Sequence, residues 1–210
     1  LREKEILLRE IHHRVKNNMQ ILTSLLRLQT RQTDSLQLRQ VLQESEARIR
    51  SMGLLHEKLY QSESVSTIDM QGYLRTLTAE LIRTNTPAGT HREVKLDVGD
   101  VNLGLDTALP CGLIITELVT NALKYAFPNR PHGTIYISLH EASGDEDFAL
   151  IVWDDGIGID NSFDITKATS LGMRLVKMLT DQLNGKLAFD GSAGTKIEIQ
   201  FKESQYKMRL

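Results

Sequence analysis

The stretch Phe148-Ala149-Leu150-Ile151-Val152-Trp153-Asp154-Asp155-Gly156-Ile157-Gly158 joins six apolar residues to two carboxylates and two glycines. A short apolar run bounded by turn residues predicts a buried strand. A carboxylate at the end of such a strand can accept a hydrogen bond from an exocyclic amino group such as that of adenine, and glycines let a ligand approach the backbone closely. Because Asp-Gly is also a common hairpin signal, this stretch alone leaves a turn and a binding site open.

Strand and helix signals alternate on both sides of this stretch. Further strands are predicted at residues 93–98, 134–140, 186–189 and 195–201, the last two as a hairpin. Helices are predicted from Asp69 to about Thr84, from Asp106 to Ala126, and from Leu171 to Leu183. We expect Asp106 to cap the second of these helices and Pro110 to lie in its first turn, where a missing N–H removes no bond. This mixture predicts an α/β sandwich with helices on one face of a mixed sheet.

The N-terminal part of the chain follows a heptad pattern instead. Its apolar seam runs through Leu8, Ile11, Val15, Asn18, Leu22 and Leu25, and after a break at residues 32–35 through Leu38, Leu42, Ser45, Ile49, Met52, His56 and Leu59. Two long helices joined by a short turn have too narrow an apolar stripe to bury alone, and pairing two copies gives a four-helix bundle. The periodicity alone favours a plain coiled-coil dimerisation stalk. A polar linker follows, so we expect a helical hairpin over residues 1–62 and an α/β domain over residues 66–203.

One face of the predicted 106–126 helix carries groups that can meet a metal and a phosphate. At about 100° per residue, Glu117, Asn121 and Lys124 lie close together on this face. An amide oxygen suits Mg²⁺, and a lysine can meet phosphate as a point charge. The opposite face is apolar and includes Cys111, Ile115, Leu118, Ala122 and Ala126. A solvated polar face of an amphipathic helix is the alternative.

Two later segments are weak signals by themselves. Gly172 lies at the start of the 171–183 helix, where free backbone N–H groups and the helix dipole favour phosphate. An ordinary N-terminal helix cap has the same sequence pattern. The Gly194-Thr195 pair precedes the terminal strand.

Taken in order, these four segments resemble the nucleotide-binding motifs of the Bergerat-type or GHKL ATPases, the superfamily of gyrase, Hsp90, histidine kinases and MutL. The resemblance covers roughly residues 66–202 and implies ATP and Mg²⁺ as cofactors. It implies that Asn121 ligates Mg²⁺, that Asp154 holds the adenine amino group, that Lys124 lies near phosphate and that Thr195 closes the adenine end. The glycines that would shape the pocket and its lid are Gly156, Gly158 and Gly172.

The lid implied by the same resemblance covers residues 160–170. It lacks the Phe-rich box of the most common histidine kinases.

The helical half identifies a branch of that superfamily. The string Glu10-Ile11-His12-His13-Arg14-Val15-Lys16-Asn17-Asn18 resembles the phosphoacceptor box of sensor kinases whose motif reads HHRVKNN, relatives of the HWE histidine kinases. If Ile11 and Val15 face the seam, His13 projects about 180° away from it and His12 only about 80°, which favours His13 as the phosphoacceptor. Arg14 stands where the common branch has an acidic residue, so Glu117 or Glu10 is the candidate base, unless none is needed.

These resemblances imply a dimeric sensor histidine kinase core, an enzyme that phosphorylates itself on His13 from ATP. They also imply transfer to an aspartate of a response-regulator receiver domain, and a sensor domain upstream. Exposed hairpin positions that we expect to touch the regulator are Gln20, Ser24 and Arg27. The alternatives are a GHKL-type ATPase or serine kinase, for which Glu117 would polarise water or a hydroxyl, and a non-catalytic nucleotide-sensing module.

The composition limits the other classes of partner. The 210 residues are 40 % hydrophobic and 25 % charged, with a formal net charge of −2, so we expect no nucleic acid partner. No apolar run approaches the roughly 18 residues that span a bilayer, so we expect a cytoplasmic fragment without membrane contact. The single cysteine, Cys111, closes no disulfide, and we expect a buried structural thiol.

Overall fold

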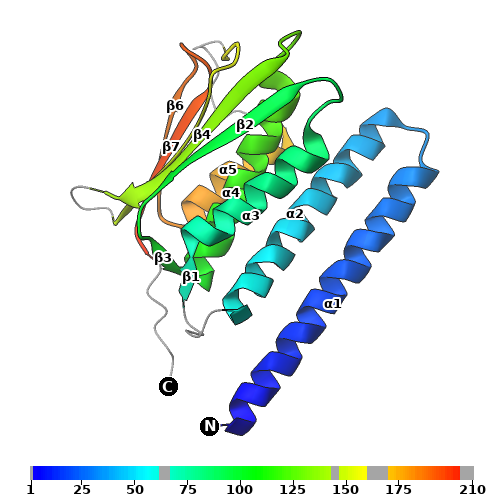
Figure 1. Cartoon of the computed structure of the whole chain (residues 1–210), viewed down its shortest axis with the longest axis vertical. Coiled ribbons are helices and arrows are strands. Elements are labelled where there is room, and N and C mark those ends of the chain that lie inside the picture. The colour runs from blue at the N-terminus through cyan, green and yellow to red at the C-terminus, as the bar shows by residue number, and fades with distance from the viewer. Residues whose placement is uncertain (1, 62–66, 143–146, 160–169, 204–210) are drawn as a thin grey trace. The chain divides into compact units, whose positions relative to one another are not determined.

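The computed structural model of the chain describes residues 2–61, 67–142, 147–159 and 170–203 (Figure 1). Side chains are described from Arg14 onward, and those of residues 58–61 lie outside the description. The chain divides into two compact units, residues 1–66 and residues 67–210.

The first unit is the predicted pair of helices, α1 (Arg2–Gln32) and α2 (Leu36–Gln61). Ser35 directly precedes α2, and its Oγ accepts a hydrogen bond from the backbone N–H of Leu38, 3.2 Å away. Polar bridges join the helices: Lys16 Nζ lies 3.0 Å from Glu57 Oε1, and Arg27 Nε lies 2.7 Å from Glu46 Oε1. The two helices of one chain are therefore held together partly by charge.

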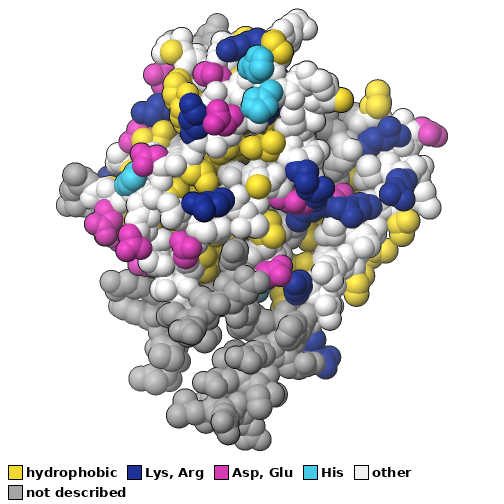
Figure 2. Space-filling view, in the orientation of Figure 1, with side chains coloured by type: hydrophobic (Ala, Val, Ile, Leu, Met, Phe, Trp, Pro, Cys, Tyr) yellow, Lys and Arg dark blue, Asp and Glu magenta, His cyan; other side chains and the backbone are white. Residues whose placement is uncertain are grey.

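Among the described side chains of α1, the less exposed face shares only Val15 with the predicted seam. The less exposed positions from Met19 onward are Met19, Thr23, Leu26 and Thr30, spaced by steps of three and four. By contrast, the seam residues Asn18, Leu22 and Leu25 are exposed, the two leucines at 49 % and 52 %. Figure 2 shows apolar side chains along this outer edge of the hairpin. A single chain therefore leaves the α1 seam exposed from Asn18 to Leu25.

The second unit is built on a five-stranded mixed sheet, as predicted. The order across the sheet is β2 (His91–Val98), β4 (His132–Glu141), β5 (Phe148–Asp154), β7 (Lys196–Phe201) and β6 (Lys186–Asp190). Strands β2 and β4 run parallel and the other neighbours antiparallel. A separate two-stranded ribbon joins β1 (Thr67–Asp69) to β3 (Asn102–Gly104).

Three helices, α3 (Met70–Asn85), α4 (Leu105–Asn121) and α5 (Leu171–Gln182), cover one face of the sheet (Figure 1). Alternate residues of β4 point at them, and Ile135 is fully buried. The intervening residues, such as Tyr136, lie on the open face. Asp69 caps α3 as predicted, because its Oδ2 accepts a hydrogen bond from Gly72 N at 3.1 Å.

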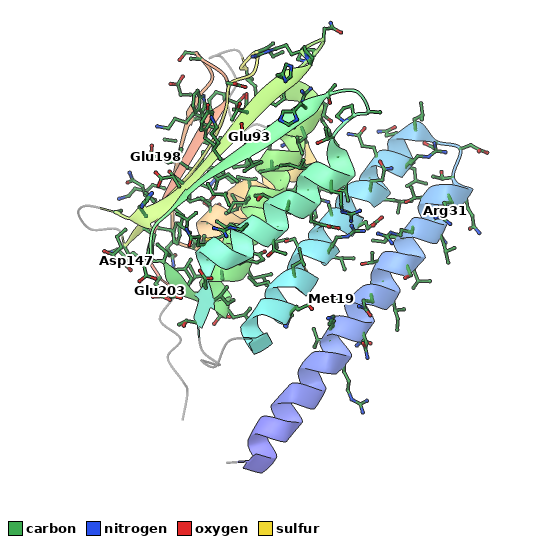
Figure 3. All side chains as sticks on the ribbon, in the orientation of Figure 1. Met19, Arg31, Glu93, Asp147, Glu198 and Glu203 are labelled. Carbon is green, nitrogen blue, oxygen red and sulfur yellow. The ribbon has the colours of Figure 1, made fainter. Side chains whose placement is uncertain are left out.

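The structure corrects the start of α4. The helix begins at Leu105 after an extended Gly104, so Asp106 lies inside its first turn and is not the cap. Pro110 lies within the helix, beyond the first turn. The reason is tertiary: Gly104 pairs with Thr67 in the small ribbon, and its N–H donates to Glu203 Oε1 at 3.0 Å, which fixes where the extended chain ends. Glu203 in turn lies beside Asp147 (Figure 3), whose Oδ2 accepts from Glu203 N at 3.0 Å.

The end of α4 also differs from the prediction of one helix to Ala126. The α-helix ends at Asn121 and a π-helical turn, η1 (Ala122–Ala126), follows. Such turns occur often at functional sites, and the local sequence gives no signal for one.

Burial raises the pKa of the Cys111 thiol to about 12, so this cysteine is inert, in line with a structural role. Among the described helices, none is both long and apolar enough to cross a membrane.

Candidate active site

The last turn of α4 meets the first turn of α5 at one end of the site. Glu117 is only 6 % exposed, and a Cβ added at Gly172 would lie 2.5 Å from Glu117 Oε2 and 3.9 Å from Asn121 Nδ2. The Asn121 amide nitrogen donates to Met173 Sδ at 3.5 Å. A side chain at position 172 would displace the Glu117 carboxylate, so glycine leaves room for this carboxylate beside the start of α5.

This end of the site has the chemistry of a phosphate and cation site. The first N–H groups of α5 carry the positive end of the helix dipole. Because the Asn121 nitrogen faces Met173, its amide oxygen faces elsewhere and suits a hard cation that also takes phosphate and water ligands. Among the described residues there is no cluster of three or more His, Cys, Asp or Glu that could hold a metal.

The π turn links this end to the glycine loop after β5. The carbonyl of Ala126, the last residue of η1, accepts a hydrogen bond from Ile157 N at 2.9 Å. A Cβ at Gly156 would lie 2.4 Å from the same carbonyl oxygen. Lys124 is exposed on this π turn, so its position does not follow the α-helical phase that grouped it with Glu117 and Asn121.

Asp154 marks the other end of the site, where β5 leaves the sheet. It is 5 % exposed, and its Oδ1 accepts hydrogen bonds from Gly156 N at 2.9 Å and from Thr195 N at 3.3 Å. The Thr195 hydroxyl also bonds to this carboxylate. Burial raises the pKa of Asp154, and these hydrogen bonds partly offset that rise. Both backbone N–H groups donate to Oδ1, so neither of these two bonds occupies Oδ2.

The glycine loop after β5 contacts the β6–β7 turn on one side and Thr134 and Arg130 on the other. Some of these residues were missed by the sequence analysis. Gly158 adopts a positive φ of 73°, and a Cβ there would lie 2.3 Å from Gly191 O. Asp155 accepts a hydrogen bond on Oδ1 from Thr134 N at 2.9 Å, and its carbonyl accepts from Arg130 Nη1 at 2.6 Å. The second aspartate of the Asp-Asp-Gly string was the available signal for this anchor, whereas Arg130 had none.

The structure thus brings the expected ATP-site residues into two groups joined by α4 and η1. One group is Glu117, Asn121 and Gly172, and the other is Asp154, Gly156, Gly158 and Thr195. Lys124 lies on the turn between them. The proposed lid, apart from Ser170, lies outside the described residues. The backbone of His13 belongs to α1, but its side chain also lies outside the description.

The fold and this site define an ATP-binding domain of the GHKL class preceded by a helical hairpin. Two family models match: one described as histidine kinase over residues 10–85, and one described as histidine kinase-, DNA gyrase B- and HSP90-like ATPase over residues 107–205. The chain belongs to the histidine kinases, as the phosphoacceptor box predicted.

Two curated relatives are sensor kinases. Sensor histidine kinase PdtaS of Mycobacterium tuberculosis is 36 % identical over 189 residues, which cover 88 % of this chain and 36 % of that protein. Blue-light-activated histidine kinase 2 of Erythrobacter litoralis is 29 % identical over 212 residues, covering 95 % and 58 %. The chain therefore spans between about a third and three fifths of the length of these relatives.

Solved structures agree with the fold. The histidine kinase domain of the Erythrobacter litoralis EL346 blue-light activated histidine kinase matches with a TM-score of 0.68 and 27 % identity, over 98 % of this chain and 97 % of that one. The histidine kinase AdeS of Acinetobacter baumannii shares the fold at 18 % identity and a TM-score of 0.53.

Proposed function

We propose that this chain is the catalytic core of a two-component sensor kinase that transfers the γ-phosphoryl group of ATP to His13 and then to an aspartate of a response regulator. Residues 1–62 would dimerise and carry the phosphoryl group, and residues 66–203 would bind ATP. The observation that carries this proposal is the convergence of Glu117, Asn121 and the Gly172 turn at one end of a site whose other end holds the buried Asp154.

In this proposal the nucleotide lies along α4 and η1. Asp154 accepts a hydrogen bond from the adenine amino group, and the backbone N–H of Thr195 donates to the Asp154 carboxylate. Asn121 offers its amide oxygen to Mg²⁺, whose bound charge would neutralise the phosphates. The N-terminal N–H groups of α5 and the exposed Lys124 contribute positive potential at the phosphate end. Phosphoryl transfer depends mainly on such positioning and charge neutralisation.

The transfer to His13 needs a neutral imidazole nitrogen that attacks the γ-phosphorus while the bond to the β-phosphate oxygen breaks and ADP leaves. The imidazole must then lose a proton. Glu117 is our proposed acceptor for that proton, because it is a buried carboxylate beside the α5 terminus, where the γ-phosphate would lie.

The hairpin supplies the proposed protein contacts. A second copy would cover the exposed apolar stripe that includes Leu22, Leu25 and Leu28. Gln20, Ser24 and Arg27 border a groove of about 440 Å³ between α1 and α2, which we propose for the receiver domain. An upstream sensor domain would control the kinase, and ATP supply makes the cytoplasm the expected compartment for this fragment.

Incubation with γ-labelled ATP and Mg²⁺ tests the central proposal. Wild-type protein should acquire a label that is labile in acid and stable in alkali, as expected for phosphohistidine. His13→Gln and Asn121→Ala should remove it, whereas the matched control His12→Gln should retain it. Acid-stable label would favour serine kinase chemistry, and ATP turnover without any label would favour an ATPase. Label that persists in His13→Gln and vanishes in His12→Gln would move the phosphoacceptor to the neighbouring histidine.

The docking proposal has its own test. Alanine replacements of Gln20, Ser24 and Arg27 should slow transfer to a receiver domain that the wild-type chain phosphorylates, without changing autophosphorylation. Gln37→Ala, at an exposed position of α2, is the control. Unaltered transfer rates in the triple variant would exclude this surface.

A further inference from the structure

The side chain of Trp153 points to the opposite face of the sheet from that of its neighbour Asp154. Both side chains nevertheless contact the same turn, residues 191–195. Successive residues of a strand face opposite sides of the sheet, so Asp154 faces the helices and Trp153 lies on the open face. The Trp153 indole Nε1 donates a hydrogen bond of 2.9 Å to the carbonyl of Ala193. Ala193 belongs to the turn of residues 191–195, which connects β6 to β7.

That turn also holds the Asp154 carboxylate. Two residues after Ala193, Thr195 donates its backbone N–H to Asp154 Oδ1 at 3.3 Å, and its carbonyl accepts from Asp154 N at 3.1 Å. Gly194 has a φ of 81°, and a Cβ there would lie 1.8 Å from Asp154 O and 3.1 Å from Trp153 Nε1. The turn is therefore pressed against β5 where Trp153 and Asp154 adjoin.

The indole is itself fixed in orientation. Tyr136 stacks on Trp153 from the neighbouring strand, with ring centroids 4.5 Å apart and an interplanar angle of 21°. Lys95 Nζ lies 5.5 Å from the centre of the Tyr136 ring, in the same row across the sheet. Glu198, also on the open face (Figure 3), pairs with Lys196 at 3.3 Å. A stacked ring that cannot turn freely holds its N–H in one direction, toward Ala193.

We infer that Trp153 is a positioning residue for base selection: its indole N–H holds the 191–195 turn, and through Thr195 it holds the carboxylate of Asp154 in the orientation that accepts a 6-amino group. This inference rests on the proposed adenine role of Asp154. Trp153 lies on the face of the sheet opposite Asp154, so its effect on binding should depend on whether the base has the amino group that Asp154 is proposed to accept.

The test compares ATP with purine riboside 5′-triphosphate, which has the same ring, sugar and phosphates but no 6-amino group. Calorimetric dissociation constants are measured on the full chain with Mg²⁺. In Trp153→Phe, which keeps the stacked ring and loses the N–H, ATP affinity should fall about threefold to tenfold, the range expected for one neutral hydrogen bond. Affinity for the purine analogue should stay within about twofold. A purely structural role would weaken both nucleotides equally, and that result, or no change in either, overturns the inference.

Two controls separate this inference from the proposed function. Tyr136→Phe keeps the stack and should bind both nucleotides as the wild type does. Asp154→Asn should abolish the preference for ATP over the analogue. If Asp154→Asn keeps that preference, the adenine role fails and the Trp153 role fails with it. If Asp154→Asn loses the preference and Trp153→Phe keeps it in full, only the Trp153 role fails.

If Trp153→Phe does not fold, a measurement on the wild-type chain still tests the inference. Trp153 is the single tryptophan of the chain, so its fluorescence reports on this one indole. Titration of the wild type with ATP should shift the emission with the dissociation constant found by calorimetry, and the analogue should shift it less. Emission that is unchanged at saturating ATP contradicts the coupling.

Discussion

The helical hairpin and the α/β domain solve the problem of burying apolar surface in different ways. The domain has a closed core, in which residues such as Ile114, Ile135 and Val119 are fully buried between sheet and helices. The hairpin leaves Leu22, Leu25 and other large apolar side chains about half exposed. A packed domain thus carries its stability within itself, whereas the proposed pairing with a second copy would supply part of the stability of the hairpin.

The largest expected effect is in the domain core. Ile135→Ala leaves a cavity between β4 and the helices and should lower the free energy of unfolding of the domain by about 2–5 kcal/mol. Chemical denaturation monitored by Trp153 fluorescence measures this loss. The midpoint should not depend on protein concentration, and a concentration-dependent midpoint would contradict a self-contained core.

The hairpin should respond in the opposite way. Leu25→Glu changes a side chain that is 52 % exposed in one chain and should barely alter its intrinsic folding. It should weaken self-association about a hundredfold, or roughly 2.7 kcal/mol, because a charge then faces the apolar stripe of a second copy. Sedimentation equilibrium over a range of concentrations is the measurement, with Gln29→Glu on the same helix as control. Equal association of the two variants would remove the proposed role of the stripe.

Acidification should have a smaller effect, a loss of nucleotide affinity in the α/β domain. Burial raises the pKa of Asp154, and its proposed adenine role needs the ionised carboxylate, so affinity should be present above that pKa and fall as the pH drops through it. The loss should begin at a higher pH than for an exposed carboxyl and reach at most about tenfold per pH unit. Calorimetry across pH with ATP and with the amino-free analogue measures it, and an equal pH dependence for both would contradict the assignment.

The folding contribution of Asp154 has the opposite sign. A raised pKa favours the protonated side chain in the folded domain. Its stabilising contribution is therefore present below the ordinary carboxyl pKa and is lost as the pH rises through the raised value. Mild acid should weaken nucleotide binding without weakening this part of the fold.

The smallest expected effect is in the polar links of the hairpin. Glu46 lies 2.7 Å from Arg27 Nε and also pairs with Arg50, so Glu46→Gln removes one charge shared by both helices. Because Arg27 is half exposed, the loss of stability should be about 1 kcal/mol or less and should shrink further in high salt. Thermal melts at low and high ionic strength measure it. A loss as large as that in Ile135→Ala would mean that charge, and not the apolar partner surface, holds the hairpin together.

Much of the fold could be predicted because its signals are local. The alternation in β4, the apolar run of β5 and the Asp69 cap depend on residues close in the chain, and each element formed where its pattern predicted. The exceptions are the β1–β3 ribbon, which was not predicted, and α4, where the pairing of Gly104 with Thr67 set the start and a π turn replaced the expected last turn. Neither feature has a local signal, because both depend on contacts with segments far away in sequence.

By itself the sequence determined the order of the α-helices and of the five main-sheet strands, the membership of the histidine kinases and the residue types available to the nucleotide site. Periodicity, caps and motif strings are properties of short segments. Only the tertiary structure decided which of those residues meet. It set Gly172 against Glu117, held Asp154 through Thr195, and tied Trp153 on the open face to the turn that carries Thr195. The physical reason is that hydrogen bonds and close backbone approaches between distant segments exist only once the sheet has fixed their register.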